Sequence, residues 1–502
     1  MALTACQPTP AVSPTPQPTG PVDEVAIALR PSPDGWTFAD LDKDLNGNDD
    51  FAPSLPFTLA NGATGTIAVR GQSTRGAAQK SYTLSLDKGQ APFLGTRHLL
   101  LNKHPFDLTR IRQTVALGLL GTIPELPAPH VAFAHLTIDG RDFGLFTRVE
   151  RVDDDFMAAR GLARDGAIYQ AKDFDFHRRP GQLVDTKDPR YDPLSFEAIL
   201  EIKGRKDHAK LLAMLDDVAD PAQGAAELLA KHFDKPNYLA WLAANMLVGN
   251  VDTGTQNMFL YAPPDAGPWR LVAWDYDQAL GWADQPGAAV QPADVPPRYD
   301  EGIALYWRSP LHRRVFQDPT LLAELTRRID ALAAGVLAPD RVAERAGAAA
   351  ALVKPWISRE PDRTGLPGPI DQYDAEVARL APTIERRRAL YHEVLARPMP
   401  FELDPPGPGP RFAWSPAIQL QGAAVRYEIT VAATPDLANP VAHQQDLTAP
   451  AATFTLPPGR YYWQVIARTQ GGAWQTAHAR FADPASGRQY EGVAAFDAKP
   501  TI

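Results

Sequence analysis

Residues 250–277 read NVDTGTQNMFLYAPPDAGPWRLVAWDYD and predict one short hairpin with polar side chains at its open ends. We expect strands at Met258–Tyr261 and Trp269–Trp274, because the proline- and glycine-rich segment between them cannot lie inside paired strands. The acidic and amide side chains beside the strand ends are Asp252, Asn257 and Asp275. The hairpin is therefore expected to bring these three side chains together.

The spacing of these residues is that of a phosphotransfer site. In protein kinases a loop aspartate receives the hydroxyl proton, an asparagine five residues later binds metal, and an aspartate after the next hairpin binds metal on the nucleotide. Asp252 and Asn257 have that separation, and Asp275 follows the hairpin. The separation alone says little, because Asn, Asp and Gly clusters usually form turns. The hairpin and the Asp-Tyr-Asp ending add weight to it.

Further motifs appear in a fixed order along the chain. They are Arg70-Gly-Gln-Ser-Thr-Arg75, Lys80-Ser-Tyr82, Gly144-Leu-Phe146 with Glu150 and Asp153, Asn250 to Asn257, and Trp274-Asp-Tyr-Asp277. Over roughly residues 65–395 the chain resembles the CotH kinase family, named for spore-coat protein H. The resemblance implies an α+β fold: a two-lobed atypical protein-kinase-like domain that transfers the γ-phosphoryl group of ATP to a Ser or Thr hydroxyl.

The resemblance also implies roles for single residues. The catalytic residues would be Asp252, as the general base, and Lys80. The nucleotide would be held by Arg70, Ser73, Arg75, Lys80, Glu150 and Asp153. The metal ligands, for Mg²⁺ or Mn²⁺, would be Asn257, Asp275 and Asp277. The expected partners are ATP and a protein substrate that presents Ser or Thr.

Several of these assignments have a plainer interpretation. Lys80 could be a solvated lysine at a strand edge, since no G-x-G-x-x-G loop accompanies it. Glu150 and Asp153 could simply begin a charged linker between the lobes. The helix expected at Arg110–Leu120, capped by Asp107, contains no Glu that could pair with Lys80.

Two other classes of function stay open at this point. The chain could be a pseudokinase or a surface adhesin, in which the same residues bind a ligand or hold the fold. It could also be a hydrolase that uses Asp275 and Asp277 as a carboxylate pair. The hydrolase hypothesis leaves Lys80 and the D-x-x-x-x-N spacing unexplained.

Composition narrows the choice of partners. A net charge of −9 and the absence of any Lys/Arg-rich run argue against a nucleic-acid-binding protein. No stretch of 18 apolar residues appears in the sequence, so no transmembrane helix is expected. An apolar fraction of 44% is enough to fill a core, and a length of 502 residues suggests about three domains.

The single cysteine predicts a location. Leu3-Thr-Ala-Cys6 resembles a bacterial lipobox, and a polar, proline-rich spacer follows it. We therefore expect an extracytoplasmic lipoprotein anchored to the membrane through Cys6 and exposed on the cell surface. Only Met1–Ala5 precede the cysteine, too few for the basic and apolar regions of a signal peptide. Either translation begins upstream, or Cys6 is an ordinary residue of a tail.

Apolar periodicity predicts the helices of the second lobe. Spacings of three and four place them at Pro193–Glu201, Ala209–Val218, Ala225–Phe233 and Pro236–Leu247, the last capped by Asp234. Later helices are expected at Ser309–Gln317, Pro319–Ala334, Pro339–Val353 and Asp371–Leu395. The first lobe should contain strands at Thr66–Val69, Ser81–Leu86, His130–Ile138 and Asp142–Glu150.

The C-terminal part predicts a separate small domain. Short strands at regular intervals after a Pro/Gly linker suggest an all-β sandwich, and residues 410–483 resemble bacterial fibronectin type III domains. The expected organisation is a lipobox and spacer at 1–22, a CotH kinase-like domain at 23–398, a linker at 399–409, the β-sandwich at 410–483 and a tail at 484–502.

Overall fold

The computed structural model describes residues 22–42, 53–71, 73–285, 301–406, 411–484 and 486–498. The chain divides into two compact units. The first holds the described residues of 1–174, 178–289 and 325–385, and the second those of 175–177, 290–324 and 386–502. Cys6 and the spacer up to Pro21 lie outside the described residues.

The first unit begins with a closed barrel of seven strands, in the order β1-β2-β3-β4-β5-β7-β6, closed by parallel pairing of β1 with β6. The strands are β1 (Asp23–Leu29), β2 (Ser54–Leu59), β3 (Thr64–Arg70), β4 (Ser81–Leu86), β5 (His98–Asn102), β6 (Val131–Ile138) and β7 (Arg141–Val149). Alternate side chains point inward and form an apolar core that includes Val25, Phe57, Ile67, Leu84 and Leu101. The strands predicted for this lobe are confirmed.

Helix α1 (Arg112–Leu120) packs against β6 and against α9 (Pro339–Ile357). It begins two residues later than predicted, and its N-cap residue, Ile111, makes no side-chain capping bond. The predicted cap, Asp107, accepts the backbone N–H of Arg112, the first residue of α1, at 3.2 Å. The same carboxylate also accepts hydrogen bonds from Thr109 and pairs with the Arg112 guanidinium.

A second sheet lies in the other lobe of this unit, in the order β11-β10-β8-β9. The strands are β8 (Ala167–Ala171), β9 (Leu200–Ile202), β10 (Met258–Ala262) and β11 (Arg270–Ala273). The hairpin predicted from residues 250–277 is β10–β11, with Met258 opposite Ala273. The helix predicted at Pro193–Glu201 was too long, because α3 ends at Glu197 and the chain then enters β9.

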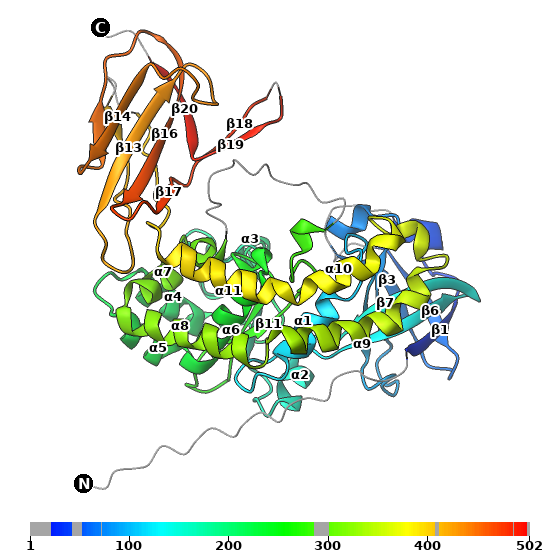
Figure 1. Cartoon of the computed structure of the whole chain (residues 1–502). Helices are drawn as coiled ribbons and strands as arrows, with labels where there is room; N and C mark the ends of the chain where they lie inside the picture. Colours follow the sequence, from blue (N-terminus) through cyan, green and yellow to red (C-terminus); the bar gives the residue numbers. More distant parts are fainter. Residues whose placement is uncertain are drawn as a thin grey trace, which may run out of the picture. The chain divides into compact units, whose positions relative to one another are not determined.

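Helices α4 (Ala209–Ala219), α5 (Ala225–His232) and α6 (Lys235–Val248) lie in the same lobe, and α6 packs against β11 (Figure 1). Helix α2 (Asp154–Ala159) follows the barrel, and α10 (Tyr373–Leu380) packs against α9. The predicted cap of α6 is confirmed, because Asp234 accepts a hydrogen bond from the N–H of Asn237. The Asn237 side chain bonds both the N–H and the C=O of Leu271, at 2.7 and 2.9 Å, and so fixes α6 to β11.

The long helix predicted at Asp371–Leu395 is interrupted. It divides into a 3-10 turn, α10, and α11 (Pro382–Leu395), because Pro382 has no N–H to continue the hydrogen-bond ladder. Helix α8 (Pro319–Ala334) has the predicted bounds, and α7 (Pro310–Gln317) is capped by Ser309. None of the helices in the described part of the chain is both long and apolar enough to cross a membrane.

The C-terminal part of the second unit contains two β-sheets around a shared core. Strands β13 (Val425–Ala432), β14 (Ala442–Leu447), β16 (Gly459–Thr469), β17 (Trp474–Thr476) and β20 (Val493–Ala498) form one, and β12 (Arg411–Ala413) with β15 (Ala451–Thr453) forms the other. Phe412 of the small sheet contacts Trp463 of the large one, with ring centroids 5.0 Å apart. The all-β domain is thus present, and its likeness to fibronectin type III domains stays a prediction. The sheet extends to Ala498, past the expected end at 483.

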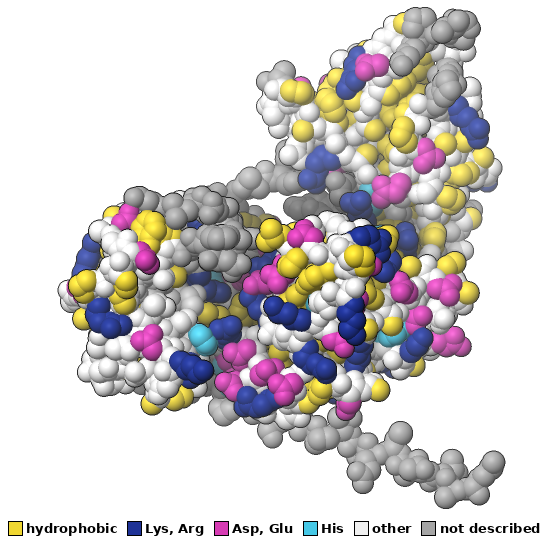
Figure 2. All heavy atoms as spheres, turned by 180° about the vertical axis from the view of Figure 1, so that it is seen from behind, with side chains coloured by type: hydrophobic (Ala, Val, Ile, Leu, Met, Phe, Trp, Pro, Cys, Tyr) yellow, Lys and Arg dark blue, Asp and Glu magenta, His cyan; other side chains and the backbone are white. Residues whose placement is uncertain are grey.

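Acidic and basic side chains are interspersed on the face that Figure 2 presents.

Candidate active site

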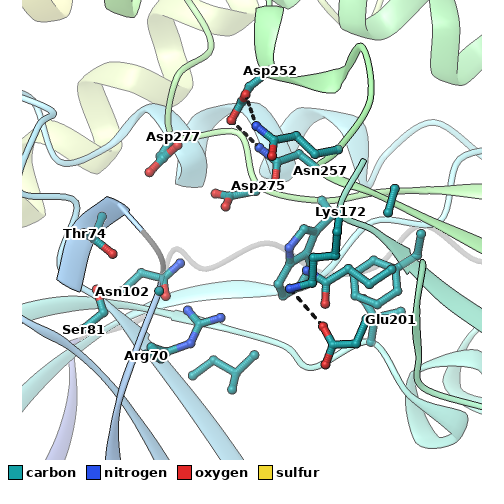
Figure 3. A pocket seen from close by; sticks show the side chains of 18 of the residues that line it. Arg70, Thr74, Ser81, Asn102, Lys172, Glu201, Asp252, Asn257, Asp275 and Asp277 are labelled. Carbon is teal, nitrogen blue, oxygen red and sulfur yellow. Dashed lines mark hydrogen bonds and ion pairs between the residues drawn. The ribbon is translucent and has the colours of Figure 1, made fainter. Parts of the chain in front are cut away.

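A cavity of about 560 Å³ lies in the first unit between the barrel and the second sheet (Figure 3). Its roof comes from the outer face of β3, β4 and β5 and consists of Arg70, Ser81, Thr83, Leu100 and Asn102. Its floor comes from β8, β9 and β10 and consists of Gln170, Glu201 and Phe259. The two lobes therefore both contribute to one cavity.

The floor residues form a row across three strands. Phe259 of β10 is opposite Gln170 of β8, and Gln170 is opposite Glu201 of β9. Residues directly opposite one another in a sheet project from the same face. The register of the sheet, rather than sequence proximity, thus brings Glu201 into the cavity.

The roof follows from the alternation of the barrel strands. Arg70 is opposite Ser81, and Thr83 is opposite Leu100. The residues between these roof positions point into the barrel core: Val69, Tyr82, Leu84 and Leu101. The inner face of the same strands stabilises the barrel while the outer face lines the cavity.

One end of the cavity is acidic. Asp252 lies in the 3-10 turn after α6, Asn257 immediately precedes β10, and Asp275 and Asp277 follow β11. The Asn257 amide donates to Asp252 Oδ2 at 2.7 Å, and the Gln256 amide donates to Oδ1. These bonds fix the Asp252 carboxylate with both oxygens occupied (Figure 3).

The two ends of the hairpin have an unusual backbone. Asn257 and Asp275 both lie in the left-handed region, each with φ of 55°. Non-glycine residues in this region carry strain of order 1–3 kcal/mol, and such residues concentrate at functional sites. The Asn250 amide donates to the carbonyl of Asp275 at 3.0 Å and ties the two chain segments together. The tight turns bring both side chains to the cavity.

The Asp275 carboxyl lies in an unfavourable environment for a negative charge. Burial raises its pKa well above the usual value, Asp277 and Asp252 raise it further, and Arg70 only partly opposes them. Its buried Oδ1 has no hydrogen-bond partner among the described residues. An orphaned carboxylate oxygen among like charges is an arrangement that a cation would relieve.

The Asp252 carboxyl is also perturbed. Burial raises its pKa, the bonds from Gln256 and Asn257 lower it, and Asp277 raises it, with a net increase. A carboxylate with a raised pKa accepts a proton more readily, which suits a general base.

The donor set fits a hard divalent cation. Carboxylate and amide oxygens are the ligands that Mg²⁺ and Mn²⁺ prefer. Among the described residues, no group of three or more His, Cys, Asp or Glu side chains is placed to hold a metal ion by itself. Mg²⁺ commonly binds through one or two carboxylates plus substrate phosphates. The residues at the acidic end suit that shared mode rather than an all-protein cage.

A second charged cluster lines the cavity at β9. The Lys172 ammonium lies 2.9 Å from Glu201 Oε2, and Lys203 pairs with Oε1 of the same carboxylate. These residues were not among the predicted site residues, because Glu201 was predicted to end a helix and instead lies in β9. The signal that could have found them is the strict alternation of Leu200-Glu-Ile-Lys203, which is typical of a strand.

Two residues predicted to hold phosphates are placed elsewhere. Lys80 and Arg75 do not line the cavity. The Lys80 ammonium donates to the carbonyl of Arg75 at 2.5 Å, and the Arg75 guanidinium donates to the carbonyl of Gly71 at 2.8 Å. Both side chains thus stabilise the 3-10 turn at Ser73–Gly76. The cavity residues of this segment are Arg70, Gly71 and Thr74, and the Ser73 side chain lies outside the described residues.

The two carboxylates predicted near the nucleotide base also have other roles. Glu150 accepts from the N–H of His130 at 2.9 Å and pairs with Arg160 at 2.6 Å. Asp153 caps α2 by accepting from the backbone of residues 155 and 156. Neither lines the cavity, where this segment instead contributes Arg151 and Val152. Both side chains have partners within the chain, and their predicted contact with the nucleotide stays a prediction.

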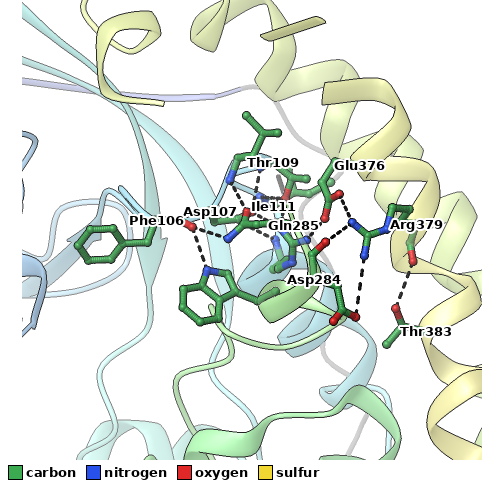
Figure 4. A network of polar contacts seen from close by, with 12 residues as sticks. Phe106, Asp107, Thr109, Ile111, Asp284, Gln285, Glu376, Arg379 and Thr383 are labelled. Atoms are coloured by element: carbon green, nitrogen blue, oxygen red, sulfur yellow. Dashed lines mark hydrogen bonds and ion pairs between the residues drawn. The ribbon is translucent and has the colours of Figure 1, made fainter. Parts of the chain in front are cut away.

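The segment after Asp277 is fixed by a polar network (Figure 4). The Gln285 side chain accepts from the N–H of Leu108 at 3.0 Å and donates to the carbonyl of Phe106 at 2.7 Å. The indole of Trp282 donates to the same carbonyl at 2.9 Å. Residues 282–285 are thus tied to the segment that precedes α1. His104, from that segment, lies 3.5 Å from Asp277 and lines the cavity.

Comparisons with known proteins agree with this arrangement. The family described as CotH kinase protein matches residues 67–391. Inner spore coat protein H of Bacillus subtilis (strain 168) is 28% identical over 242 residues, which are 48% of this chain and 66% of that protein. The match therefore spans slightly less than two thirds of the relative's own length.

Two solved structures show weak likeness. The HipA–HipB–operator DNA complex of Shewanella oneidensis MR-1 has a chain with 14% identity, covering 62% of this chain and 60% of that one, at a TM-score of 0.25. The golgi casein kinase has 10% identity, covering 74% and 73%, also at 0.25. Scores this low support no argument about function. The family match, by contrast, covers more than half of the chain, and the protein belongs to the CotH kinase family.

Proposed function

We propose that the protein is a kinase that transfers the γ-phosphoryl group of ATP to a Ser or Thr hydroxyl of an extracytoplasmic or cell-surface protein. The observation that carries the proposal is the convergence of Asp252, Asn257 and Asp275 on one cavity from the two ends of one hairpin. Membership of the CotH kinase family supports the same chemistry.

Asp252 serves as the general base. Its carboxylate takes the proton of the acceptor hydroxyl as that oxygen attacks the γ-phosphorus, and ADP leaves with the electrons of the broken P–O bond. The hydrogen bonds from Gln256 and Asn257 hold the carboxylate in place before the acceptor arrives. The raised pKa of Asp252 favours the proton transfer.

The phosphates bind between the acidic end and the roof. Asn257 and Asp275, with Asp277 as a further ligand, hold Mg²⁺ or Mn²⁺, which neutralises phosphate charge when bound. Arg70, which lines the roof and already opposes the charge of Asp275, binds phosphate oxygens directly. Lys80 has no part in this proposal, since its ammonium is used by the 3-10 turn.

A location outside the cytoplasm agrees with two observations. Leu3–Cys6 resembles a lipobox, and one relative carries the name inner spore coat protein H. Expression with the natural upstream sequence should place the protein in the membrane fraction, and Cys6→Ala should release it. Equal partition of both forms into the soluble fraction would contradict the anchor.

The test of function is direct. Purified protein is incubated with ATP labelled on the γ-phosphate, Mn²⁺ or Mg²⁺, and a casein-like acceptor. Label should appear on Ser or Thr of the acceptor or of the protein itself, and should be lost with Asp252→Asn but kept with Glu227→Gln, an exposed carboxylate on α5. Nucleotide binding without labelling would indicate a pseudokinase. Release of phosphate without an acceptor would indicate a hydrolase.

A further inference from the structure

Several charged side chains of the cavity have no role in the chemistry described so far, and three of them form a cluster. These three are Lys172, Glu201 and Lys203, with side-chain exposures of 28%, 27% and 26%. Both Glu201 oxygens are paired with an ammonium. Burial raises the pKa of Glu201, but Lys203 and Lys172 outweigh it, so the carboxylate stays ionised well below neutral pH. We call these three residues the β9 cluster.

The position of the β9 cluster follows from the sheet register. Glu201 is two strands away from Phe259, and neighbouring strands lie about 4.8 Å apart. The cluster is therefore roughly 10 Å across the floor from β10, the strand that begins next to Asn257. In a nucleoside triphosphate, a ribose and two phosphates separate the base from the terminal phosphate. With the terminal phosphates at Asn257 and Asp275, the base extends toward β9.

The cavity also contains an apolar part that would accept a flat ring. The lining side chains that provide it are all buried, and they are Leu100, Val152, Ala171, Phe259 and Trp274. Leu100 belongs to the roof and Phe259 to the floor, so an aromatic ring can lie between the two lobes. Only the polar edge of such a ring would then need hydrogen-bonding partners.

We propose that the β9 cluster reads the edge of the nucleotide base and selects adenine, an inference that rests on the proposed kinase function. The Glu201 carboxylate accepts a hydrogen bond from the exocyclic amine of adenine, and a lysine ammonium donates to a ring nitrogen beside it. Hypoxanthine presents a carbonyl oxygen in place of the amine. That oxygen would face the carboxylate and leave both groups unpaired.

Two other ligands for the cluster are less well supported. An acidic acceptor peptide or a phosphate would be attracted by lysines, but both ammonium groups here already pair with Glu201. The Glu201 carboxylate between the lysines cancels part of their charge and so weakens their attraction for an anion. An uncharged base edge with both a donor and an acceptor is the ligand that such a cluster suits.

The experiment measures dissociation constants by calorimetry for ATP, ITP and inorganic tripolyphosphate in the presence of Mn²⁺. The wild-type protein should bind ATP about 10- to 100-fold more tightly than ITP, the range for one hydrogen bond to a charged group. Glu201→Gln should bring the ATP/ITP ratio close to one and leave tripolyphosphate binding unchanged. Glu227→Gln should keep the wild-type ratio.

The outcomes separate this inference from the proposed function. An ATP/ITP ratio unchanged by Glu201→Gln overturns base reading while the kinase function stands. If Lys172→Met and Lys203→Met weaken tripolyphosphate as much as ATP, the cluster binds phosphate and the inference fails. If these substitutions change only the KM for an acidic acceptor, the cluster binds the acceptor and the inference also fails. Failure of the wild type to bind any nucleotide overturns both proposals. Glu201→Asp, which keeps the charge, should also lower the ratio if the Gln variant does not fold.

Discussion

Two groups of buried carboxylates in the first unit differ in their neighbours: one group is paired with a cation, and the other lies among further carboxylates. Asp107 and Glu376 are both paired with the buried guanidinium of Arg112 (Figure 4). Burial raises the pKa of Asp107, but Arg112 and Thr109 more than compensate, and the pKa lies below its usual value. Burial likewise raises the pKa of Asp275, but there the neighbouring carboxylates raise it further (Figure 3).

Buried carboxylates that stabilise the fold have cationic partners within the chain, as Asp362 also does with Lys103 at 2.5 Å. Asp275 keeps an unpartnered oxygen, although a single guanidinium like that of Arg112 would have satisfied it. Under the proposed function, a cation and its phosphates would supply the partners that the protein does not. The comparison can be tested at both ends.

The largest effect is expected at the incomplete site. Asp252→Asn removes the proton acceptor and should lower turnover by about 10²–10⁴-fold, because general bases contribute factors of this size. Binding of ATP with Mn²⁺ should persist, because the metal ligands remain. Phosphoryl transfer and nucleotide affinity, measured on the same preparation, check this. Wild-type turnover in the variant would remove the base assignment.

The next largest effect is a loss of stability, expected at the paired carboxylates Asp107 and Glu376. Arg112→Met leaves Asp107 buried without a guanidinium and Glu376 with Arg379 alone, and should lower the free energy of unfolding by about 3–5 kcal/mol. Urea unfolding measures this loss. Arg164→Met, which breaks an exposed ion pair with Asp155, should change stability little. Equal effects of the two substitutions would mean that burial does not distinguish these pairs.

At Asp275, removal of charge should have two opposite effects. Asp275→Asn should raise the melting temperature of the protein in EDTA, because it removes a charge that burial and two carboxylates disfavour. The same variant should lose the stabilisation that ATP and Mn²⁺ give the wild type, about 2.7 kcal/mol at a ligand concentration of 100 times Kd. A destabilised variant in EDTA would show that the charge is satisfied within the protein.

The smallest effect concerns His312, a buried histidine of α7. Burial lowers the pKa of His312 to about 3, and its ring packs against Phe176, Tyr306 and Phe316 in the second unit. The unfolded chain binds the proton near pH 6.5 and the folded protein only near pH 3. Stability from this group is therefore complete above pH 6.5 and decreases as the pH falls toward 3.

His312→Gln should reduce the pH dependence of unfolding in that window by at most about 1.4 kcal/mol per pH unit. Urea unfolding of wild type and variant at pH 5 and pH 7 checks the slope. His177→Gln, at an exposed position of the same unit, serves as the control. A slope that the His312 substitution leaves unchanged would mean that the histidine is protonated in the folded protein.

Local signals predicted much of the fold and the acidic half of the site. Helix α6 has its cap at Asp234 and its glycine at Gly249, and the β10–β11 hairpin has strands on both sides of a proline-rich turn. All of that information lies within a few residues of each element. The acidic residues at the hairpin ends could therefore be assigned before the structure was known.

The positions of the basic residues beside β9 depend on pairing between strands that are far apart in the sequence. Strand β9 has three residues, so the alternation of Leu200-Glu-Ile-Lys203 is a weak signal by itself, and the strand is defined by the pairing of Ile202 with Tyr169, 33 positions earlier. The role of Lys80 was hidden for a related reason. Its partner is a carbonyl whose direction depends on the 3-10 turn, which no sequence pattern describes. Side chains whose position is set by pairing far along the chain are the ones that were missed.

The alternation of the barrel strands has an evolutionary consequence. In β3, β4 and β5, each residue that faces the cavity is followed or preceded by one that fills the barrel interior, as Thr83 and Leu84 show. Selection for folding therefore acts on one set of positions, and selection for ligand preference acts on the set between them. A lineage can exchange roof residues one at a time, and so drift toward a new nucleotide or acceptor, while the residues that keep it folded stay as they are.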